Sequence, residues 1–249
     1  MSSISIVMPA YNAARFLPET IASVVAQTCR DWELLVADDC STDDTRRVVA
    51  RHAAGDARIR LIALPRNGGP AMARQAALEV ARGRFIAFLD SDDLWLPGKL
   101  QRQLEFMRST GVAFSCTAFR RISADGSRAG RIVHVPPRLT YHQLLGNTAV
   151  ATSTAVLDRD LTGPFRMVKT YYDDFALWLE ITRRGFPACG LDEDLMRYRV
   201  TGGSVSRNKL RSAMKVWRLY RDVERLSLGP AYWAFARYAA NAARKYRSF

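Results

Sequence analysis

The stretch FIAFLDSDDLWLPGKL, residues 85–100, decides the fold and raises the first chemical question. It begins with an apolar run that is typical of a buried strand. The run ends abruptly in Asp90, Asp92 and Asp93. Burying a carboxylate costs free energy unless a cation or a hydrogen-bond donor pairs with it. The three acids therefore predict either a binding site at the tip of the strand or a cap for the helix that begins near Pro97.

Strand-like apolar runs alternate with helical patterns through the first half of the chain. The predicted strands are 4–8, 32–37, 59–64 and 85–90, and the predicted helices are 16–28, 42–54 and 70–82, with Gly83 as the C-cap of the last helix. This alternation predicts an α/β fold whose sheet is mainly parallel and covered by helices on both faces. Ligands bind beyond the carboxyl ends of such strands, so the polar segments that follow three of them should meet at one edge.

The second half of the chain predicts a different set of elements. They are a hairpin of 112–122 and 131–135, a strand at 148–157, a helix at 172–185, a strand at 195–200 and a turn at 201–204. Two amphipathic helical stretches follow, and Gly229-Pro230 separates them. The first carries an apolar stripe that includes Val216, Trp217 and Tyr220, and the second carries Tyr232 and Phe235.

Composition indicates a globular protein of 249 residues, one large domain or a domain with an appendage, with an apolar fraction of 48%. The first twelve residues lack the pattern of a secretory signal, and no apolar run approaches the ~18 residues of a membrane span. The four cysteines are scattered, which predicts neither a zinc site nor a disulfide framework. A cytoplasmic location fits these features best.

The net charge of +13 is concentrated at the C-terminal end. Between residues 207 and 249, eleven Lys and Arg stand against Asp222 and Glu224, so this segment carries +9 of the total. Two interpretations are open. Its apolar stripes pack on the rest of the protein and leave the charges in water, or the tail contacts an anionic membrane surface. Nucleic-acid binding is disfavoured because the chain has neither zinc-finger spacing nor the aromatic runs of an RNA-binding sheet.

The residues DSDD suit a divalent cation. In an extended chain, alternate side chains point the same way, so Asp90 and Asp92 face one side and Ser91 the other. Mg²⁺ and Mn²⁺ are commonly held by one or two carboxylates together with the phosphates of a substrate. The alternative is that Asp92 or Asp93 caps the following helix, or that these acids are simply hydrated.

A second acidic segment, VADDCSTDDT, follows the predicted strand 32–37. Asp39 stands at the strand tip and could accept a hydrogen bond from the imide N–H of a nucleotide base. Ser41 and Asp44 are spaced like a capping box for the next helix. We expect at least one acid here, Asp43 or Asp44, to serve only as a cap.

Two further motifs offer charged side chains near helix starts. Gly68-Gly69 and Pro70 predict a turn into a helix, and Arg74 lies one turn inside it, where it can bind an anion or simply lie at the surface. Asp173 and Asp174 begin the predicted helix 172–185, where the helix dipole favours carboxylates. An ionised aspartate at that point can also act as a general base.

In their order and spacing these motifs resemble family 2 glycosyltransferases. The matching segments are SIVMPAYN, VADDCSTDDT, NGGPAMARQAAL, GRFIAFLDSDDLW and YYDDFALWLEI, and the resemblance spans roughly residues 3–206. The ending YRVTGGSVSRNK is similar to bacterial enzymes that build cell-wall or capsular polysaccharides of the teichuronic-acid type. The resemblance implies a Rossmann-like nucleotide-diphospho-sugar transferase fold, the glycosyltransferase A fold. Residues 1–206 would be catalytic, with a nucleotide-sugar half at 1–110 and an acceptor half at 111–206, and 207–249 would form a helical extension.

The resemblance also implies roles for particular residues. Pro9, Ala10 and Tyr11 would cradle the base and ribose, Asp39 would read the uracil imide, and Arg74 and Ser91 would lie at the nucleotide. Asp90 would lie towards the ribose and, with Asp92, at the metal, and Asp174 would be the catalytic base. Two positions depart from the family pattern. Cys40 stands where many members have glycine, and Thr201 stands where many have histidine.

The activity that the resemblance implies is inverting transfer of a sugar from a nucleotide diphosphate donor, with UDP as the expected nucleotide. It implies Mn²⁺ or Mg²⁺ as cofactor and a saccharide or a lipid-linked oligosaccharide as acceptor. The expected location is the cytoplasm, with the basic tail able to hold the protein on the inner face of the membrane. A sugar-phosphate nucleotidyltransferase is the nearest alternative, although PAYNAARF lacks the basic glycine-rich loop of that class. A basic nucleic-acid-binding protein is a remote one.

Overall fold

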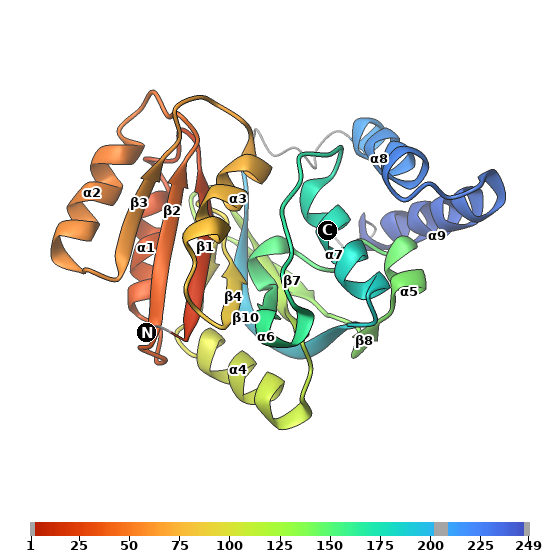
Figure 1. The fold of residues 1–249 in the computed structure, drawn as a ribbon, viewed down its shortest axis with the longest axis horizontal. Coiled ribbons are helices and arrows are strands. Elements are labelled where there is room, and N and C mark those ends of the chain that lie inside the picture. Colours follow the sequence, from red (N-terminus) through yellow and green to blue (C-terminus); the bar gives the residue numbers. More distant parts are fainter. Residues whose placement is uncertain (1–2, 202–208, 247–249) are drawn as a thin grey trace.

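The computed structural model describes residues 3–201 and 209–246 and contains one large sheet with helices on both sides (Figure 1). Its strand order is β3-β2-β1-β4-β9-β6-β10-β5, with β7 beside β6 and β8 beside β10. The strands are β1 (Ile4–Ala10), β2 (Trp32–Asp38), β3 (Ile59–Ala63), β4 (Phe85–Phe88), β5 (Leu94–Trp95), β6 (Phe114–Ser123), β7 (Ala129–Val133), β8 (Arg138–Leu139), β9 (Val156–Asp158) and β10 (Ala188–Val200).

The helices lie in the connections between these strands and at the C-terminal end. They are α1 (Leu17–Val25), α2 (Thr45–Gly55), α3 (Pro70–Val80), α4 (Lys99–Thr110), α5 (Tyr141–Leu145), α6 (Arg159–Thr162), α7 (Asp173–Arg183), α8 (Lys209–Arg218) and α9 (Leu228–Tyr246). A 3₁₀ turn, η1 (Thr152–Thr154), precedes β9, and a π-helical turn, η3 (Leu219–Val223), continues α8.

Strands β3, β2, β1 and β4 are mutually parallel, as the alternation of strands and helices predicts. Alternate residues of a strand point to opposite faces, and two apolar cores form accordingly. Val7 and Leu35 face the core that α3 and α7 cover, whereas Ile6 and Leu34 face the core of α1 and α4. The antiparallel strand β9 joins this parallel half to the parallel pair β6 and β10. The predicted fold class and the hairpin of β6 and β7 are therefore confirmed.

Three predicted boundaries are wrong. The strand expected at 148–157 is reduced to β9, because the preceding residues turn to reach the site described below. Strand β10 begins at Ala188, seven residues before the predicted start at 195. Gly83 does not cap α3, which ends at Val80. Its lack of a side chain matters for packing instead, because a Cβ there would lie 2.5 Å from the backbone nitrogen of Ser5.

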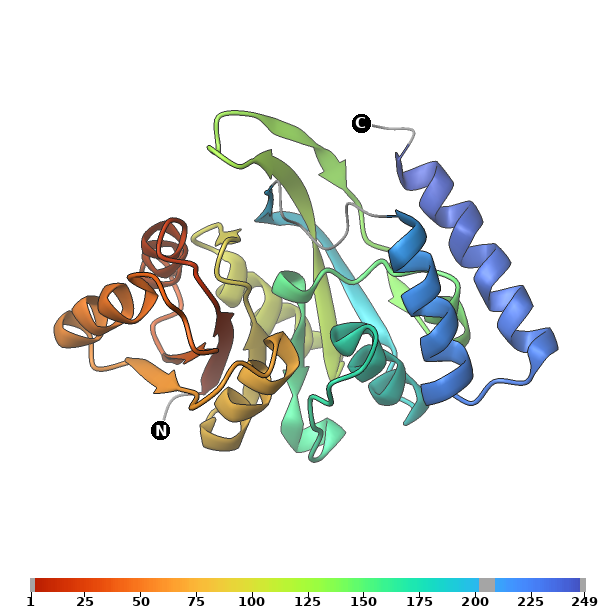
Figure 2. The ribbon, with the colours of Figure 1, turned by 90° about the horizontal axis from the view of Figure 1, so that it is seen from above.

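The C-terminal helices pack against α5 and α7, with α8 lying between α7 and α9 (Figures 1 and 2). Val216, Leu219 and Tyr220 are fully buried in the core that α7 covers, which confirms the packing interpretation of the first stripe. Gly229-Pro230 does not break the helices but lies in the first turn of α9, where proline is tolerated. Of the second stripe, Tyr232 is 64% exposed. The predicted turn at 201–204 and the division at 206/207 lie outside the described residues.

The basic C-terminal segment does not form a membrane-spanning helix in the part that the structure describes. Neither α9, the longest helix there, nor any other described helix combines the length and apolar content needed to cross a bilayer.

Candidate active site

The loops after β1 and β2 are locked together beside the predicted nucleotide site. Ala10 C=O accepts a hydrogen bond from Asp39 N–H at 2.8 Å. Asn12, which has a left-handed φ of 47°, accepts a hydrogen bond from Thr42 N–H at 2.8 Å through its side-chain oxygen. Tyr11 remains 52% exposed. Pro9 and Ala10 therefore end β1 at the edge where the strand tips meet. Tyr11 follows them, and its side chain is open to solvent.

The capping box predicted for α2 does not form. Ser41 Oγ accepts a hydrogen bond from Asn12 N–H at 3.0 Å, so it serves the neighbouring loop instead. Asp44 is the N-cap residue of α2 but its side chain makes no capping bond; the carboxylate of Asp43, one residue earlier, accepts the N–H of Thr45 at 2.9 Å instead. Cys40, at the position where the resemblance expects glycine, has a φ of 65°, a left-handed conformation that favours glycine.

Asp39 connects the tip of β2 to the glycine-rich loop. Its two carboxylate oxygens accept hydrogen bonds from Gly68 N–H and Gly69 N–H, both at 2.7 Å. Asp39 is almost completely buried. Since each carboxylate oxygen has two lone pairs, these bonds fix the orientation of the group and leave acceptor capacity for a ligand.

Arg74 is the cation at the centre of the site. It extends from α3, is almost completely buried, and forms an ion pair with Asp90 at the end of β4. Burial opposes its charged form, but Asp90, Asp174 and Asp173 together raise the pKa of the Arg74 guanidinium above its ordinary value. The structure therefore brings together three motifs that are far apart in the sequence: the helix after Gly68-Gly69, DSDD and the acid pair of α7.

Asp92 and Asp93 lie in different environments. Burial and the neighbouring Asp90 raise the pKa of Asp92 to about 6. Asp93 is fully buried and accepts hydrogen bonds from Ser153 Oγ at 2.5 Å and from Arg199 N–H at 2.9 Å. It does not cap α4, whose N-cap is Gly98. Asp93 is therefore part of the support beneath the site.

The donor set at the tip of β4 fits a divalent cation. Asp90 and Asp92 are hard oxygen donors whose mutual repulsion a cation would offset. Among the described residues, no cluster of three or more His, Cys, Asp and Glu could hold a metal ion by itself. A site with only the two carboxylates of Asp90 and Asp92 matches the way Mg²⁺ and Mn²⁺ are held by one or two carboxylates plus substrate phosphates. One oxygen of Asp90 is already bonded to Arg74, so Asp92 is the better placed ligand.

Asp174 begins α7 and is held by two hydrogen bonds. Oδ2 accepts from Thr152 Oγ1 at 2.5 Å, and Oδ1 accepts from Phe175 N–H at 2.7 Å. Its neighbour Asp173 accepts from Thr170 N–H at 2.5 Å, and burial raises the pKa of Asp173. The two acids of the pair are thus held separately, and Asp174 is the one attached to η1.

Turn η1 contains functional residues that sequence reasoning missed. Ser153 Oγ donates to Asp93 and accepts from Asp90 N–H at 3.0 Å, while Thr152 donates to Asp174. One three-residue turn therefore positions both the DSDD loop and the predicted base. The only sequence signal was the polar triplet TST inside an apolar run, at the place where an uninterrupted strand was expected.

Arg199, near the end of β10, is the second missed residue. Its side chain donates to Asp92 C=O at 2.9 Å and pairs with Glu19 at 2.6 Å, while its own backbone supports Asp93. The late segment YRVT thereby attaches to the DSDD loop through an arginine. The position at which the resemblance expects histidine is Thr201, which lies two residues further along.

Solved structures with the same architecture come from glycosyltransferases. Residues 1–349 of TarS from S. aureus, in complex with UDP-GlcNAc, superpose with a TM-score of 0.71 at 20% identity, covering 95% of this chain and 71% of that one. The mannosyltransferase PcManGT from Pyrobaculum calidifontis, in complex with GDP-Man and Mn²⁺, gives a TM-score of 0.70 at 20% identity, covering 99% and 76%. The fold is thus the glycosyltransferase A fold.

Comparisons of sequence then establish the family. Residues 5–173 match the model of glycosyl transferase family 2. A teichuronic acid biosynthesis glycosyltransferase of Bacillus subtilis, TuaG, is 42% identical over 244 residues, which are 97% of this chain and 96% of that protein. An Escherichia coli protein named as a UDP-Glc:α-D-GlcNAc-diphosphoundecaprenol β-1,3-glucosyltransferase, WfgD, is 37% identical over 231 residues, covering 92% and 90%. This chain belongs to glycosyltransferase family 2 and is a glycosyltransferase, which decides against the nucleotidyltransferase alternative.

Proposed function

We propose that this enzyme transfers a sugar from a UDP-sugar to a hydroxyl group of a lipid-linked saccharide diphosphate in bacterial surface-polysaccharide synthesis. The observation that carries the proposal is the cluster around Arg74, which joins the DSDD loop to the acid pair of α7. Transfer needs a binding site for the nucleotide diphosphate and a base for the acceptor hydroxyl at the same place. The cluster around Arg74 brings together Asp90, predicted at the donor, and Asp174, predicted as the base. The name of WfgD, which contains a GlcNAc-diphosphoundecaprenol, supports the acceptor class, and the name of TuaG supports a role in polysaccharide synthesis.

In this proposal the donor lies across the tips of β1, β2 and β4. Pro9, Ala10 and Tyr11 form one wall for the base and ribose, and Asp39 accepts the imide N–H of the uracil. Asp39 is suited to this because the hydrogen bonds from Gly68 and Gly69 hold its carboxylate rigidly.

Asp90 and Ser91 contact the donor at the tip of β4, and Arg74 lies beside them at the nucleotide. Asp92, with Asp90, would hold Mn²⁺ or Mg²⁺, which when bound would offset the negative charge that develops on the departing diphosphate. Arg74 keeps Asp90 oriented and lowers the negative potential around the donor. The chain's own cation and a bound metal ion thus favour the same leaving group.

Asp174 serves as the general base. Thr152 and Phe175 N–H orient its carboxylate, and it takes the proton from the acceptor hydroxyl as that oxygen attacks the anomeric carbon. The oxygen approaches from the face opposite the leaving diphosphate, so the configuration inverts in one step. No covalent intermediate on the enzyme is required.

Replacement of the base tests the proposal. Asp174→Asn keeps the size of the side chain and its acceptor oxygen but removes the basic group, so transfer should fall by at least ~100-fold while the Kd for UDP-sugar changes little. The control is Asp160→Asn, which alters an exposed acid of α6 whose side chain is 63% exposed. Turnover close to that of the parent enzyme in Asp174→Asn would contradict the assignment.

We also propose that the exposed basic side chains of the C-terminal helices hold the protein on the inner face of the cytoplasmic membrane. Arg237 of α9 and Arg225, in the connection between η3 and α9, are exposed, and each Lys or Arg near an anionic surface contributes about 1 kcal/mol. Changing both to glutamate should weaken co-sedimentation with phosphatidylglycerol vesicles, and binding that is unchanged would contradict this. Deleting α9 is a poorer test because Ala231 and Ala234 are part of the core.

A further inference from the structure

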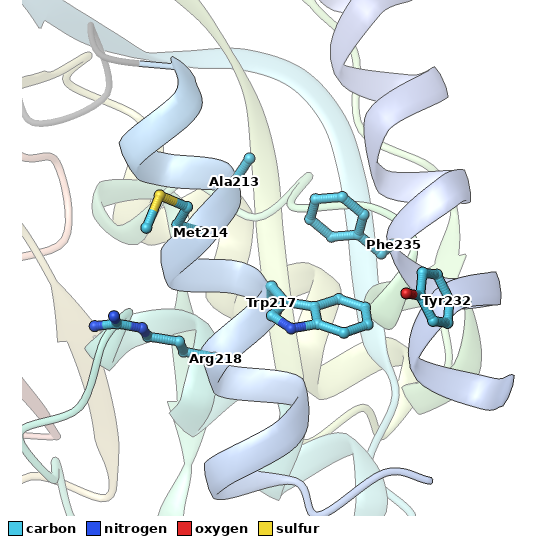
Figure 3. A pocket seen from close by; sticks show the side chains of 6 residues that line it. All are labelled: Ala213, Met214, Trp217, Arg218, Tyr232 and Phe235. Carbon is cyan, nitrogen blue, oxygen red and sulfur yellow. The ribbon is translucent and has the colours of Figure 1, made fainter. Parts of the chain in front are cut away.

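Side chains of α8 and α9 line an open apolar groove that the catalytic roles above do not use (Figure 3). Its volume is about 380 Å³, within the usual range for pockets that bind small molecules. The side chains that line it are Ala213, Met214, Trp217, Arg218, Tyr232 and Phe235. Except for the arginine, its lining is apolar or aromatic.

The groove leaves large apolar side chains in contact with water. Met214 is 52% exposed and Tyr232 is 64% exposed. The ring of Trp217 lies between the two helices, with its centroid 5.0 Å from that of Tyr232 and 5.5 Å from that of Phe235 (Figure 3). Exposed apolar surface of this kind, gathered in one concavity, marks a binding surface more often than a random surface feature.

Cationic side chains of α8 connect this groove to the active site. Lys215 acts electrostatically on Asp173, the neighbour of the proposed base. The guanidinium of Arg218 lies 5.6 Å from the centre of the Tyr171 ring, in the segment that leads into α7. Asp222 also lies there and accepts a hydrogen bond from the Tyr171 hydroxyl. Figure 3 shows Arg218 and Met214 on a different side of α8 from Trp217.

We propose that this groove binds the first isoprene units of the acceptor's polyprenyl chain, and that Lys215 and Arg218 bind the acceptor's diphosphate. The proposal rests on the proposed function, because it assumes an acceptor in which a saccharide is joined through a diphosphate to a lipid. Such an acceptor presents a reacting hydroxyl, then two phosphates, then an apolar chain. The structure presents the acid pair of α7, then Lys215, which acts on Asp173, and then Arg218, which lines the groove itself.

The chemistry of each part matches its partner. Arginine forms charge-assisted and often bidentate hydrogen bonds with phosphate oxygens. Aromatic and thioether side chains in a concave site favour burial of a branched hydrocarbon. General adhesion to a membrane would not single out the groove, because Trp233 of α9 is 69% exposed and does not line the groove. The two kinds of contact can therefore be separated by mutation.

The test compares two acceptors that carry the same saccharide diphosphate, one ending in a short isoprenyl chain and the other in a methyl group. The groove variant combines Met214→Ser with Tyr232→Ser, both exposed enough to leave the fold intact, and the matched control is Trp233→Ser. We expect the groove variant to lower the ratio of kcat/KM for the isoprenyl over the methyl acceptor by about 10-fold. The control should leave this ratio unchanged.

A binding measurement makes the result independent of transfer. Farnesyl diphosphate, titrated calorimetrically in the presence of EDTA, should bind the parent protein and bind the groove variant about 10-fold more weakly. Arg218→Ala should weaken the binding of farnesyl diphosphate, whereas Arg47→Gln, at an exposed arginine of α2, should not.

The possible outcomes separate the two proposals. Equal losses in the groove variant and in Trp233→Ser, or farnesyl diphosphate binding that the groove variant leaves unchanged, would overturn the groove assignment. Groove-dependent binding of farnesyl diphosphate without transfer to either acceptor would support the groove and reject the proposed acceptor.

Discussion

Replacing the buried arginine of the site, Arg74→Gln, should destabilise the protein well beyond an ordinary surface change. The side chain of Arg74 is 8% exposed and pairs with Asp90, whose side chain is 29% exposed. Removing one partner of a buried ion pair costs about 3–5 kcal/mol, because the other charge is left uncompensated. Water reaches part of Asp90, which lowers this cost, but Arg74 also interacts with Asp174. We therefore expect the free energy of unfolding to fall by about 3 kcal/mol.

Urea denaturation followed by tryptophan fluorescence measures this loss. The matched control is Arg102→Gln, since Arg102 is 54% exposed and pairs with Glu193 at the surface, where an ion pair is worth less than about 1 kcal/mol. A double-mutant cycle with Asp90→Asn isolates the pair, and its coupling energy should reach about 1–3 kcal/mol. A loss in Arg74→Gln no larger than that in Arg102→Gln, together with additive single mutants, would refute the central role given to this cation.

Four further predictions concern the support of the site and its chemistry. Thr152→Val should lower kcat by about 10-fold without changing the Kd for the donor, since it removes one charge-assisted hydrogen bond from Asp174, and Thr152→Ser should restore activity. Cys40→Gly should raise the free energy of unfolding by about 1 kcal/mol in urea, because it relieves a left-handed residue, with transfer unchanged. Gly83→Ala should lower that free energy by about 1–3 kcal/mol in the same assay, since the new methyl group meets the backbone of β1. EDTA should abolish transfer, and Asp92→Asn should raise the Mn²⁺ concentration needed to restore it by at least ~10-fold; activity that persists in EDTA would exclude the metal assignment.

The sequence predicted secondary structure best where the local apolar pattern and the tertiary environment of an element agree. Strands β1, β2 and β4 are buried on both faces, so their apolar runs stand out, and the helices between them show their periodicity clearly. The prediction that their polar ends meet at one edge follows from the geometry of parallel strands alone. It required no knowledge of contacts.

The sequence predicted less well the structure and role of residues whose hydrogen-bond partners lie far away along the chain. The segment 148–157 has the composition of a strand, yet Thr152 and Ser153 turn away to bind Asp174, Asp93 and the backbone of Asp90. Asp93 looked like a helix cap, and its partners Ser153 and Arg199 lie 60 and 106 residues further along the chain. No local rule connects residues so far apart.

The amino-acid sequence by itself determined the α/β class and predicted the edge of the candidate site with its acids and arginine, because strand periodicity and chain direction are local properties. Only the tertiary structure decided what each charged group does. Arg74 joins two acidic motifs, Asp93 supports the site from beneath, and α8 brings Lys215 to Asp173 of α7. The physical reason is that the energy of a charge depends on its burial and on its neighbours in space, and a sequence orders neighbours only along the chain.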